Sequence, residues 1–383
     1  MLVLLHRQYE GVRWRAQRVR VDRFSLPYFA GGSQPRRALL ITHAHRIASS
    51  QIFPHFYFRH SIARRYGVQV GEINLEAFEA LPASEVPQVD IVGIQTWFDI
   101  DKTRLQKLFD RARELCKPSK VVYFDCLAPT DLRLAEAIGD RADVYVKKHV
   151  LRDRSAYGKR IRGDTNLMEY YCRRYNIDCA ETAFPIPDGF LERLRVGPSF
   201  ATADYLMPYF CSGHMRSTRK TIDVHARLGR QGTEWYEAMR NESLGALDGL
   251  RGLNVARDFG VGRRHYLREL GASKICYSPF GYGEVAWRDY EAIAHGSLLL
   301  KPDMSHLETE PDVFIAGETY VPFKWDFSDV EQKIRYYLEN STEREEIAER
   351  AFTKLHEYFR SDGFVTQCAP IYEPVRTRDT FAS

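Results

Sequence analysis

Residues 273–303 contain the densest group of side chains in the sequence that could bind an anionic ligand. The segment reads as a strand, a loop with Pro279, Gly281 and Gly283, a helix and a second strand. In open α/β sheets, ligands bind beyond the carboxyl ends of the strands. The free N–H groups at the start of the next helix favour anions such as phosphate groups. The segment therefore predicts an anion-binding crevice at the edge of a sheet.

Arg288 and Glu291 stand one turn apart in this predicted helix. A cation in the first turn of a helix is unfavourable against the helix dipole unless it faces an anion or a carboxylate. A carboxylate one turn later can accept two hydrogen bonds from the diol of a ribose. Taken alone, the spacing fits a surface ion pair between the two residues equally well.

Three other groups of residues are expected to reach the same crevice. Arg263 and Arg264 lie at a loop–helix junction, where their guanidinium groups would neutralise a diphosphate without a metal ion. Arg227 follows the strand expected over 222–226, and His306 follows the strand expected over 297–301. The alternatives are a solvated basic face for the arginines and a capped loop with an incidental histidine for residues 303–309.

Polar side chains also end the strands predicted in the N-terminal half. His43, Asp99 and Asp125 each follow one strand, and each could act as a general base towards a hydroxyl group. A structural role is the alternative for each of them. His43 and His45 do not predict a metal site, because side chains two residues apart on an extended chain point to opposite faces and no third ligand is nearby.

The elements that position these residues follow the alternating pattern of parallel α/β sheets. Buried strands are predicted over 38–42, 89–94, 120–125 and 142–146, and again over 222–226, 254–256, 274–278 and 297–301. A helix is expected after the first strand as far as residue 65. We therefore expect an N-terminal Rossmann-like domain over 1–200, which includes an irregular connection over 151–200. A C-terminal domain over 201–383 follows, and its last helix is expected to pack back on the first domain.

The composition is that of a globular protein. The chain has 383 residues, 44% hydrophobic and 28% charged, which sets aside disordered and collagen-like classes. Lys and Arg total 55 against 51 for Asp and Glu, an excess too small to imply a nucleic-acid partner. Seven cysteines without a C-x-x-C pattern argue against a disulfide framework or a zinc site and indicate a reducing cytoplasm.

Residues 12–21 are the segment of the sequence that could contact a membrane. No stretch approaches the ~20 apolar residues that a membrane-spanning helix needs. Residues 12–21 alternate apolar and basic side chains. They predict either a charged edge strand that resists aggregation or a patch that rests on anionic lipid at the inner face of a membrane.

The order of residues over 260–305 resembles that of a known group of enzymes. An S-K-x-C-x-x-P-x-G strand and loop followed by R-x-x-E-A-I-x-x-G is similar to the nucleotide-sugar-binding region of GT-B glycosyltransferases. The resemblance is strongest to exostosin-like enzymes and to the bacterial family-1-like enzymes grouped with spore-maturation glycosyltransferases. It implies an α/β protein with the GT-B fold, in which two Rossmann-like domains face a central cleft.

The resemblance also implies roles for individual residues. Glu291 would hold the ribose of the nucleotide, and the glycine loop would lie against the diphosphate and the sugar. Many retaining enzymes of this fold have a second glutamate eight positions earlier; that position is Gly283 here, and the nearest acid is Glu284. The residues expected to contact the donor are Arg227, Arg263, Arg264, Tyr266, Ser278, Gly281, Tyr282, Gly283, Glu284, Arg288, Glu291 and His306.

The expected activity is transfer of a sugar from a nucleotide-sugar donor to a hydroxyl of a glycan or lipid-linked glycan, as in bacterial surface polysaccharide synthesis. Arginine side chains and helix-terminal N–H groups would stabilise the departing phosphate, so neither a metal ion nor another cofactor is expected. Asp125, His43 and Asp99 are the catalytic candidates on the acceptor side. A nucleotide-sugar epimerase or hydrolase is the enzymatic alternative, and a nucleic-acid-binding protein, for which no motif is present, is the non-enzymatic one.

Overall fold

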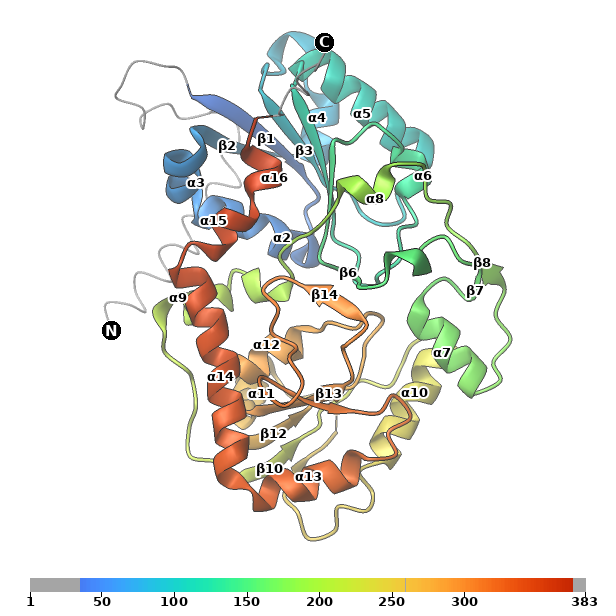
Figure 1. Ribbon diagram of the computed structural model, residues 1–383, viewed down its shortest axis with the longest axis vertical. Coiled ribbons are helices and arrows are strands. Elements are labelled where there is room, and N and C mark those ends of the chain that lie inside the picture. Colours follow the sequence, from blue (N-terminus) through green and yellow to red (C-terminus); the bar gives the residue numbers. More distant parts are fainter. Residues whose placement is uncertain (1–34, 259, 375–383) are drawn as a thin grey trace, which may run out of the picture.

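A computed structural model describes residues 35–258 and 260–374 of the chain. Figure 1 shows two α/β domains, one above the other, with the long helix α14 (Ser341–Arg360) running beside the lower one. The basic segment over 12–21 lies outside the described residues, so its two interpretations both stay predictions.

The N-terminal domain is built on a parallel sheet of six strands in the order β2-β1-β3-β4-β5-β9. The strands are β1 (Arg36–Thr42), β2 (Val68–Asn74), β3 (Ile91–Ile94), β4 (Lys120–Asp125), β5 (Val144–Lys147) and β9 (Leu194–Val196). The four central strands are those predicted from the sequence. The two edge strands, β2 and β9, are additional. β2 is mostly half-buried, so its sequence lacks the continuous apolar run of a central strand.

Helices cover both faces of this sheet. One face packs against α4 (Leu75–Ala80), α5 (Lys102–Cys116) and α6 (Ala135–Ile138). The other face packs against α2 (Arg46–Tyr57) and α3 (Arg59–Tyr66). The single helix expected as far as residue 65 is therefore two helices, which Phe58 separates.

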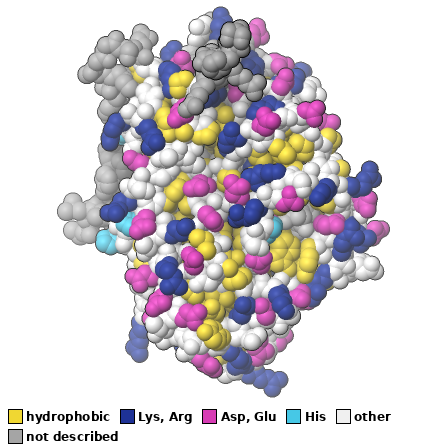
Figure 2. All heavy atoms as spheres, viewed as in Figure 1, with side chains coloured by type: hydrophobic (Ala, Val, Ile, Leu, Met, Phe, Trp, Pro, Cys, Tyr) yellow, Lys and Arg dark blue, Asp and Glu magenta, His cyan; other side chains and the backbone are white. Residues whose placement is uncertain are grey.

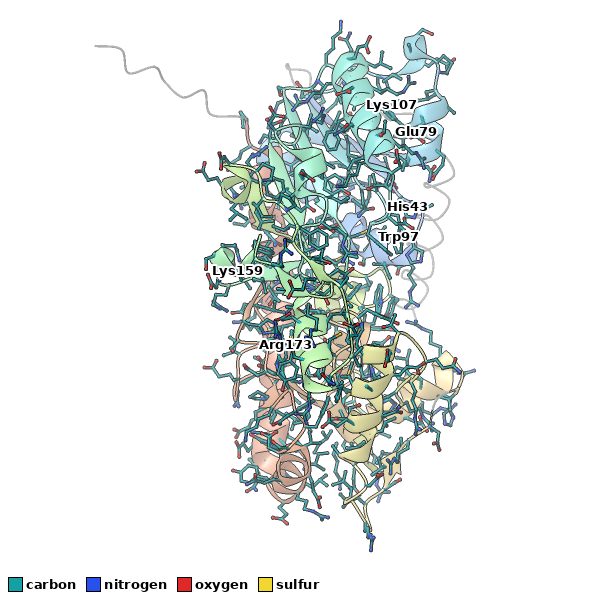
Figure 3. The ribbon with its side chains drawn as sticks, turned by 90° about the vertical axis from the view of Figure 1, so that its right-hand side faces the viewer. His43, Glu79, Trp97, Lys107, Lys159 and Arg173 are labelled. Atoms are coloured by element: carbon teal, nitrogen blue, oxygen red, sulfur yellow. The ribbon has the colours of Figure 1, made fainter. Side chains whose placement is uncertain are left out.

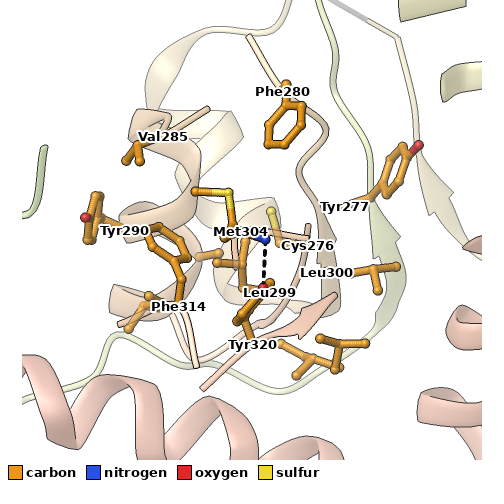
Figure 4. Packing of buried hydrophobic residues seen from close by; sticks show 14 of the residues in the cluster. Cys276, Tyr277, Phe280, Val285, Tyr290, Leu299, Leu300, Met304, Phe314 and Tyr320 are labelled. Carbon is orange, nitrogen blue, oxygen red and sulfur yellow. Dashed lines mark hydrogen bonds between the residues drawn. The ribbon is translucent and has the colours of Figure 1, made fainter. Parts of the chain in front are cut away.

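The C-terminal domain has a parallel sheet of five strands in the order β11-β10-β12-β13-β15. Its strands are β10 (Ile222–His225), β11 (Val255–Ala256), β12 (Ser273–Tyr277), β13 (Leu298–Pro302) and the unpredicted edge strand β15 (Val321–Phe323). Its helices, besides α14, are α10 (Glu234–Gly245), α11 (Arg263–Gly271), α12 (Trp287–Ala294) and α13 (Val330–Glu339). Figure 4 shows part of its core, where the Met304 backbone N–H donates to the Tyr320 hydroxyl at 3.0 Å.

The connection over 151–200 contains short helices and strands separated by turns and loops. These are β6 (His149–Leu151), β7 (Ile161–Arg162), α7 (Asn166–Arg174), β8 (Glu181–Thr182) and α8 (Phe190–Arg193), and α9 (Met207–Ser212) follows β9. β9 completes the N-terminal sheet, whereas α7 contacts the C-terminal domain, where the Tyr171 hydroxyl donates to the Trp325 carbonyl at 3.2 Å. β6 pairs with β14 (Leu307–Thr309) in an antiparallel ribbon that joins the two domains.

The chain crosses back to the N-terminal domain at its end. α15 (Gly363–Gln367) and α16 (Ala369–Tyr372) place Phe364, Val365 and Tyr372 in the same buried cluster as Leu40 and Val122 of the N-terminal sheet. Apolar side chains from both ends of the described chain therefore share one core.

The surface carries charges of both signs. On the face drawn in Figure 2, described Lys and Arg side chains are interspersed with Asp and Glu side chains. None of the helices in the described ranges is long and apolar enough to cross a membrane.

Candidate active site

The loop between β12 and α12, residues 278–286, lies directly against the N-terminal domain. A Cβ atom placed on Gly283 would lie 2.4 Å from the carbonyl oxygen of Ala128, which follows β4. No side chain fits in that space without moving backbone. The carboxyl ends of the two sheets therefore face each other, and the glycine loop expected to contact the donor lies between them.

Glu291 lies one turn inside α12, at this interface, and is 6% exposed. The Tyr205 hydroxyl donates to its Oε1 at 2.8 Å, and the guanidinium of Arg263 is 4.0 Å from the same oxygen. Burial and the Glu291 carboxylate both raise the pKa of Tyr205, which therefore stays a hydrogen-bond donor. Glu291 is thus a buried carboxylate and not a member of a surface ion pair.

Arg288 uses its guanidinium on the backbone. It donates to the carbonyl of Arg227 and, at 3.4 Å, to the carbonyl of Tyr277, so it braces the ends of β10 and β12. Tyr266 packs edge-on against His225 at 4.9 Å between ring centroids. Burial raises the pKa of Tyr266, and Glu291 raises it further against the opposing charge of Arg288.

Arg227 was expected to bind phosphate, but in the structure it is held by other partners. Glu269 of α11 accepts two hydrogen bonds from it, at 2.5 and 2.7 Å, and backbone carbonyls of Arg257 and Asp258 accept two more. Arg227 in turn lowers the pKa of Glu269. Arg264 is exposed. Among the described residues no ion pair engages Arg264, whereas the exposed Arg263 lies at the 4.0 Å limit of an ion pair with Glu291.

Ser278 and Tyr282 fix the shape of the loop. The Ser278 hydroxyl donates to Asp289 at 2.6 Å; Asp289 also accepts the Ala286 N–H at 2.8 Å, which caps α12, and pairs with Lys301 at 3.0 Å. The Tyr282 ring stacks on Tyr236 at 4.5 Å. Sequence reasoning missed Asp289 and Lys301, although an acid three residues after a helix start is a recognisable capping signal.

Glu284 is completely buried between the two domains. His149 of β6 lies 3.6 Å from one carboxylate oxygen, and His306 lies 3.7 Å from the other. Neither oxygen has a hydrogen-bond partner, and neither ring nitrogen of His149 has one. Burial raises the pKa of Glu284, but the two histidines lower it by more, so it stays ionised. His149 comes from the other domain and belongs to no motif, so sequence reasoning missed it.

Two arginines, Arg46 and Arg263, lie near Glu291 at the interface, and Gly281, expected to contact the donor, lies in the 278–286 loop. Arg46, the first residue of α2, lies 5.0 Å from the ring centre of Tyr205 and 4.7 Å from that of Trp287. Arg263 lies 4.0 Å from the Tyr205 ring centre. Guanidinium groups from both domains therefore meet on one tyrosine whose hydroxyl reaches Glu291. No sequence motif marks Arg46, Tyr205 or Trp287.

The three acceptor-side candidates have different surroundings. Asp125 is buried and accepts hydrogen bonds from Lys147 at 2.8 Å and from the Tyr145 hydroxyl at 2.6 Å, so its carboxylate is committed to the core. Asp99 is exposed. The His43 ring lies 5.3 Å from that of Trp97, and Figure 3 shows both on the edge of the molecule opposite to Lys159. In the described parts of the chain, no three His, Cys, Asp or Glu side chains are grouped to hold a metal ion.

Several solved structures are similar to this chain in their fold. The chain is similar to a crystal structure of a glycosyltransferase from Rickettsia africae, with a TM-score of 0.51 and 11% identity over 89% of this chain and 98% of that one. It is also similar to an α-glucosyltransferase in complex with UDP-glucose and DNA containing an abasic site, with a TM-score of 0.47 and 9% identity over 87% of this chain and 100% of that one. For sucrose-phosphate synthase from Thermosynechococcus elongatus the TM-score is 0.43 and the identity 12%, over 88% of this chain and 98% of that one. The chain has the GT-B fold, which confirms the predicted fold class.

A family model matches a part of the chain that lies in the C-terminal domain. Residues 218–368 match the model described as "Glycosyl transferase-like". This range includes the loop over 278–286 and both Glu284 and Glu291. No curated protein matches the chain.

Proposed function

We propose that this protein is a glycosyltransferase that moves a sugar from a nucleotide-sugar donor to a hydroxyl of a glycan or lipid-linked glycan. The observation that carries the proposal is the buried Glu291 carboxylate. It follows a glycine loop at the interface of two Rossmann-like domains, inside the segment that matches the glycosyl transferase-like model. The resemblance to exostosin-like and spore-maturation-type enzymes remains part of this proposal.

The donor would occupy three parts of the interface. A ribose diol would hydrogen bond to Glu291 in place of the Tyr205 hydroxyl. Arg263, Arg264 and the backbone N–H groups at the start of α12 would bind the phosphates. Sugar hydroxyls would satisfy the Glu284 oxygens, which have no hydrogen-bond partner although they are buried.

In the reaction, the acceptor oxygen bonds to the anomeric carbon, and the bond from that carbon to the phosphate oxygen breaks with its electron pair left on the phosphate. Positive side chains stabilise that developing charge. The acceptor proton needs a base, and we propose His43 for this step because Asp125 is engaged by Lys147. Close contact of the domains would exclude water that could hydrolyse the donor.

The first test is ligand binding. A thermal shift screen with UDP, GDP, CDP, dTDP, ADP and CMP should raise the melting temperature of the wild-type protein with one of them by a few degrees, since a ligand at 100 times its Kd adds about 2.7 kcal/mol. Glu291→Gln should remove this shift, and the exposed Glu339→Gln should keep it. A wild-type protein that binds none of these nucleotides, or an unchanged shift in Glu291→Gln, would contradict the proposal.

We further propose that transfer is independent of a metal ion, because guanidinium groups are present to neutralise the leaving phosphate. Transfer rates measured with and without EDTA should agree within about twofold. Loss of activity in EDTA that Mg²⁺ or Mn²⁺ restores would disprove metal independence.

A cytoplasmic location, a role in surface polysaccharide synthesis and contact of residues 12–21 with anionic lipid are further parts of the proposed function.

A further inference from the structure

Arg240 of α10 is a buried cation without an anionic partner. It is 8% exposed, and in the described part of the chain no carboxylate lies within ion-pair distance of it. Its Nε has no hydrogen-bond partner at all. A buried charge that is not paired destabilises a folded protein, because the lost hydration is not replaced.

The guanidinium of Arg240 lies beneath the 278–286 loop. Its carbon is 4.9 Å from the ring centre of Tyr236, and a Cβ atom on Gly281 would lie 3.9 Å from its Nη2. Two other cations are close enough to affect this region, Arg288 and Lys301. Lys301 is paired with Asp289 at 3.0 Å and Arg288 donates to backbone carbonyls, whereas no carboxylate of the described residues pairs with Arg240 and its Nε has no acceptor.

Arg240 stays charged in this environment. Burial is the main cause that lowers its pKa to about 10; Arg288 acts in the same direction, and Tyr236 and Tyr277 oppose the change. A pKa near that value still leaves the group protonated at neutral pH. The protein thus keeps a positive charge under a ligand-binding loop at a cost to its own stability.

We propose that Arg240 binds a phosphate group of the nucleotide donor from beneath the glycine loop. The proposal rests on the proposed function. A guanidinium group presents two parallel N–H donors that match two phosphate oxygens, and such charge-assisted pairs are strong in a dry site. Arg227, which sequence reasoning placed in this role, is already occupied by Glu269. The charge of Arg240 is matched only when the donor is bound.

This assignment predicts opposite changes in stability and affinity. Arg240→Met keeps most of the length of the side chain but removes the unpaired charge, so the ligand-free protein should melt at a higher temperature. The same variant should bind the phosphates less well. A merely structural arginine would give a lower melting temperature and unchanged binding.

The experiment measures melting temperature and calorimetric affinity for wild type, Arg240→Met, Arg240→Lys and the control Arg251→Met, which changes an exposed arginine in the turn before β11. The probes are the nucleoside diphosphate that binds the wild type best, the matching nucleoside without phosphates, and inorganic pyrophosphate. We expect Arg240→Met to melt a few degrees higher, to bind the diphosphate at least tenfold more weakly and to bind the nucleoside as before. Arg240→Lys should be intermediate, and Arg251→Met unchanged.

Other outcomes separate the two proposals. If the wild type binds a nucleotide but Arg240→Met is less stable and binds the diphosphate equally well, the role of Arg240 is overturned while the proposed function stands. An equal loss of affinity for the nucleoside also overturns it, because the damage is then not specific to phosphate. If no nucleotide binds the wild type, the proposed function fails. The affinity for pyrophosphate then tests Arg240 separately: weaker binding of pyrophosphate by Arg240→Met than by the wild type supports an anion site, and equal binding rejects it.

Discussion

At the scale of single residues, the buried charges divide by whether they have partners. Lys147 with Asp125 and Lys301 with Asp289 are ion pairs at 2.8 and 3.0 Å with both members almost fully buried. Such pairs hold the side chains in one arrangement, and the paired charges are not available to a substrate. The carboxylate of Asp125, proposed as a base from its position in the sequence, is thus engaged by Lys147, whereas no carboxylate of the described residues pairs with Arg240.

Buried neutral histidines give the protein a predictable sensitivity to acid. Burial lowers the pKa of His55 from 6.5 to about 3, and its Nδ1 is hydrogen-bonded with the Tyr372 hydroxyl at 2.8 Å. The unfolded state then binds more protons below pH 6.5, so stability is lost as the pH falls from that value towards 3. From pH 7 to pH 5 the loss from His55 amounts to about 2 kcal/mol. His225, shifted in the same direction, adds a second contribution.

Denaturant unfolding at both pH values checks this prediction. His55→Gln should be less stable than the wild type at pH 7, but its further loss between pH 7 and pH 5 should be about 2 kcal/mol smaller. The exposed His214→Gln should behave as the wild type. An equal pH dependence in His55→Gln would show that His55 is not the residue that titrates.

Sequence and structure agree best where a residue acts through its own segment. Glu291 could be proposed as a binding residue from the sequence, because its loop and helix are contiguous there. Tyr205 and His149 contact the same interface from segments far away along the chain, and no local pattern marks them. For Arg227 the position at a strand end was recognised, but its partner Glu269, 42 residues later, was not, since only the fold brings the two together.

At the scale of elements, the loop over 278–286 depends on one glycine. Gly283→Ala places a methyl group 2.4 Å from the Ala128 carbonyl oxygen, and this neighbour is backbone, which cannot turn away as a flexible side chain can. We expect a loss of about 1–3 kcal/mol of unfolding free energy from overpacking. Nucleotide binding should weaken as well, because the loop must move off the N-terminal domain.

Gly245→Ala at the end of α10 is the matched control, because nothing lies within 4 Å of a Cβ atom there. It should be neutral or more stable by up to about 1 kcal/mol. Unchanged stability and binding in Gly283→Ala would show that the two domains are not in contact at this point.

The strands show where prediction from sequence works and where it does not. Central strands such as β4 are buried at every position, so their apolar runs are continuous and easily recognised. The edge strands β2, β9 and β15 are short or half-buried, and their sequences resemble those of loops. The pairing of β6 with β14 could not be predicted, because three residues from each domain carry too little pattern to specify a partner.

At the scale of the whole molecule, the ribbon of β6 and β14 ties the domains together on the face shown in Figure 1. Arg154 pairs with Glu308 across it at 2.6 Å, and Arg152 donates to the Leu307 carbonyl at 3.0 Å. If the domains must separate to release the nucleotide, this ribbon has to open in each cycle.

A cross-link across the ribbon tests this motion. Val150 and Glu308 are directly opposite in the antiparallel ladder, so Val150→Cys with Glu308→Cys places two thiols within reach of a disulfide. After oxidation we expect repeated turnover to fall at least tenfold and to recover on reduction, while each single-cysteine variant is insensitive to the oxidant. Full turnover by the cross-linked protein would show that the ribbon stays closed throughout the reaction.

The return of α15 and α16 to the N-terminal sheet has a consequence for biosynthesis. Leu40 and Val122 are covered in part by Phe364, Val365 and Tyr372. A ribosome that has made the whole first sheet still has more than a hundred residues to translate before that cover emerges. One apolar face of the N-terminal sheet therefore lacks this part of its cover until residues 364–372 have been synthesised.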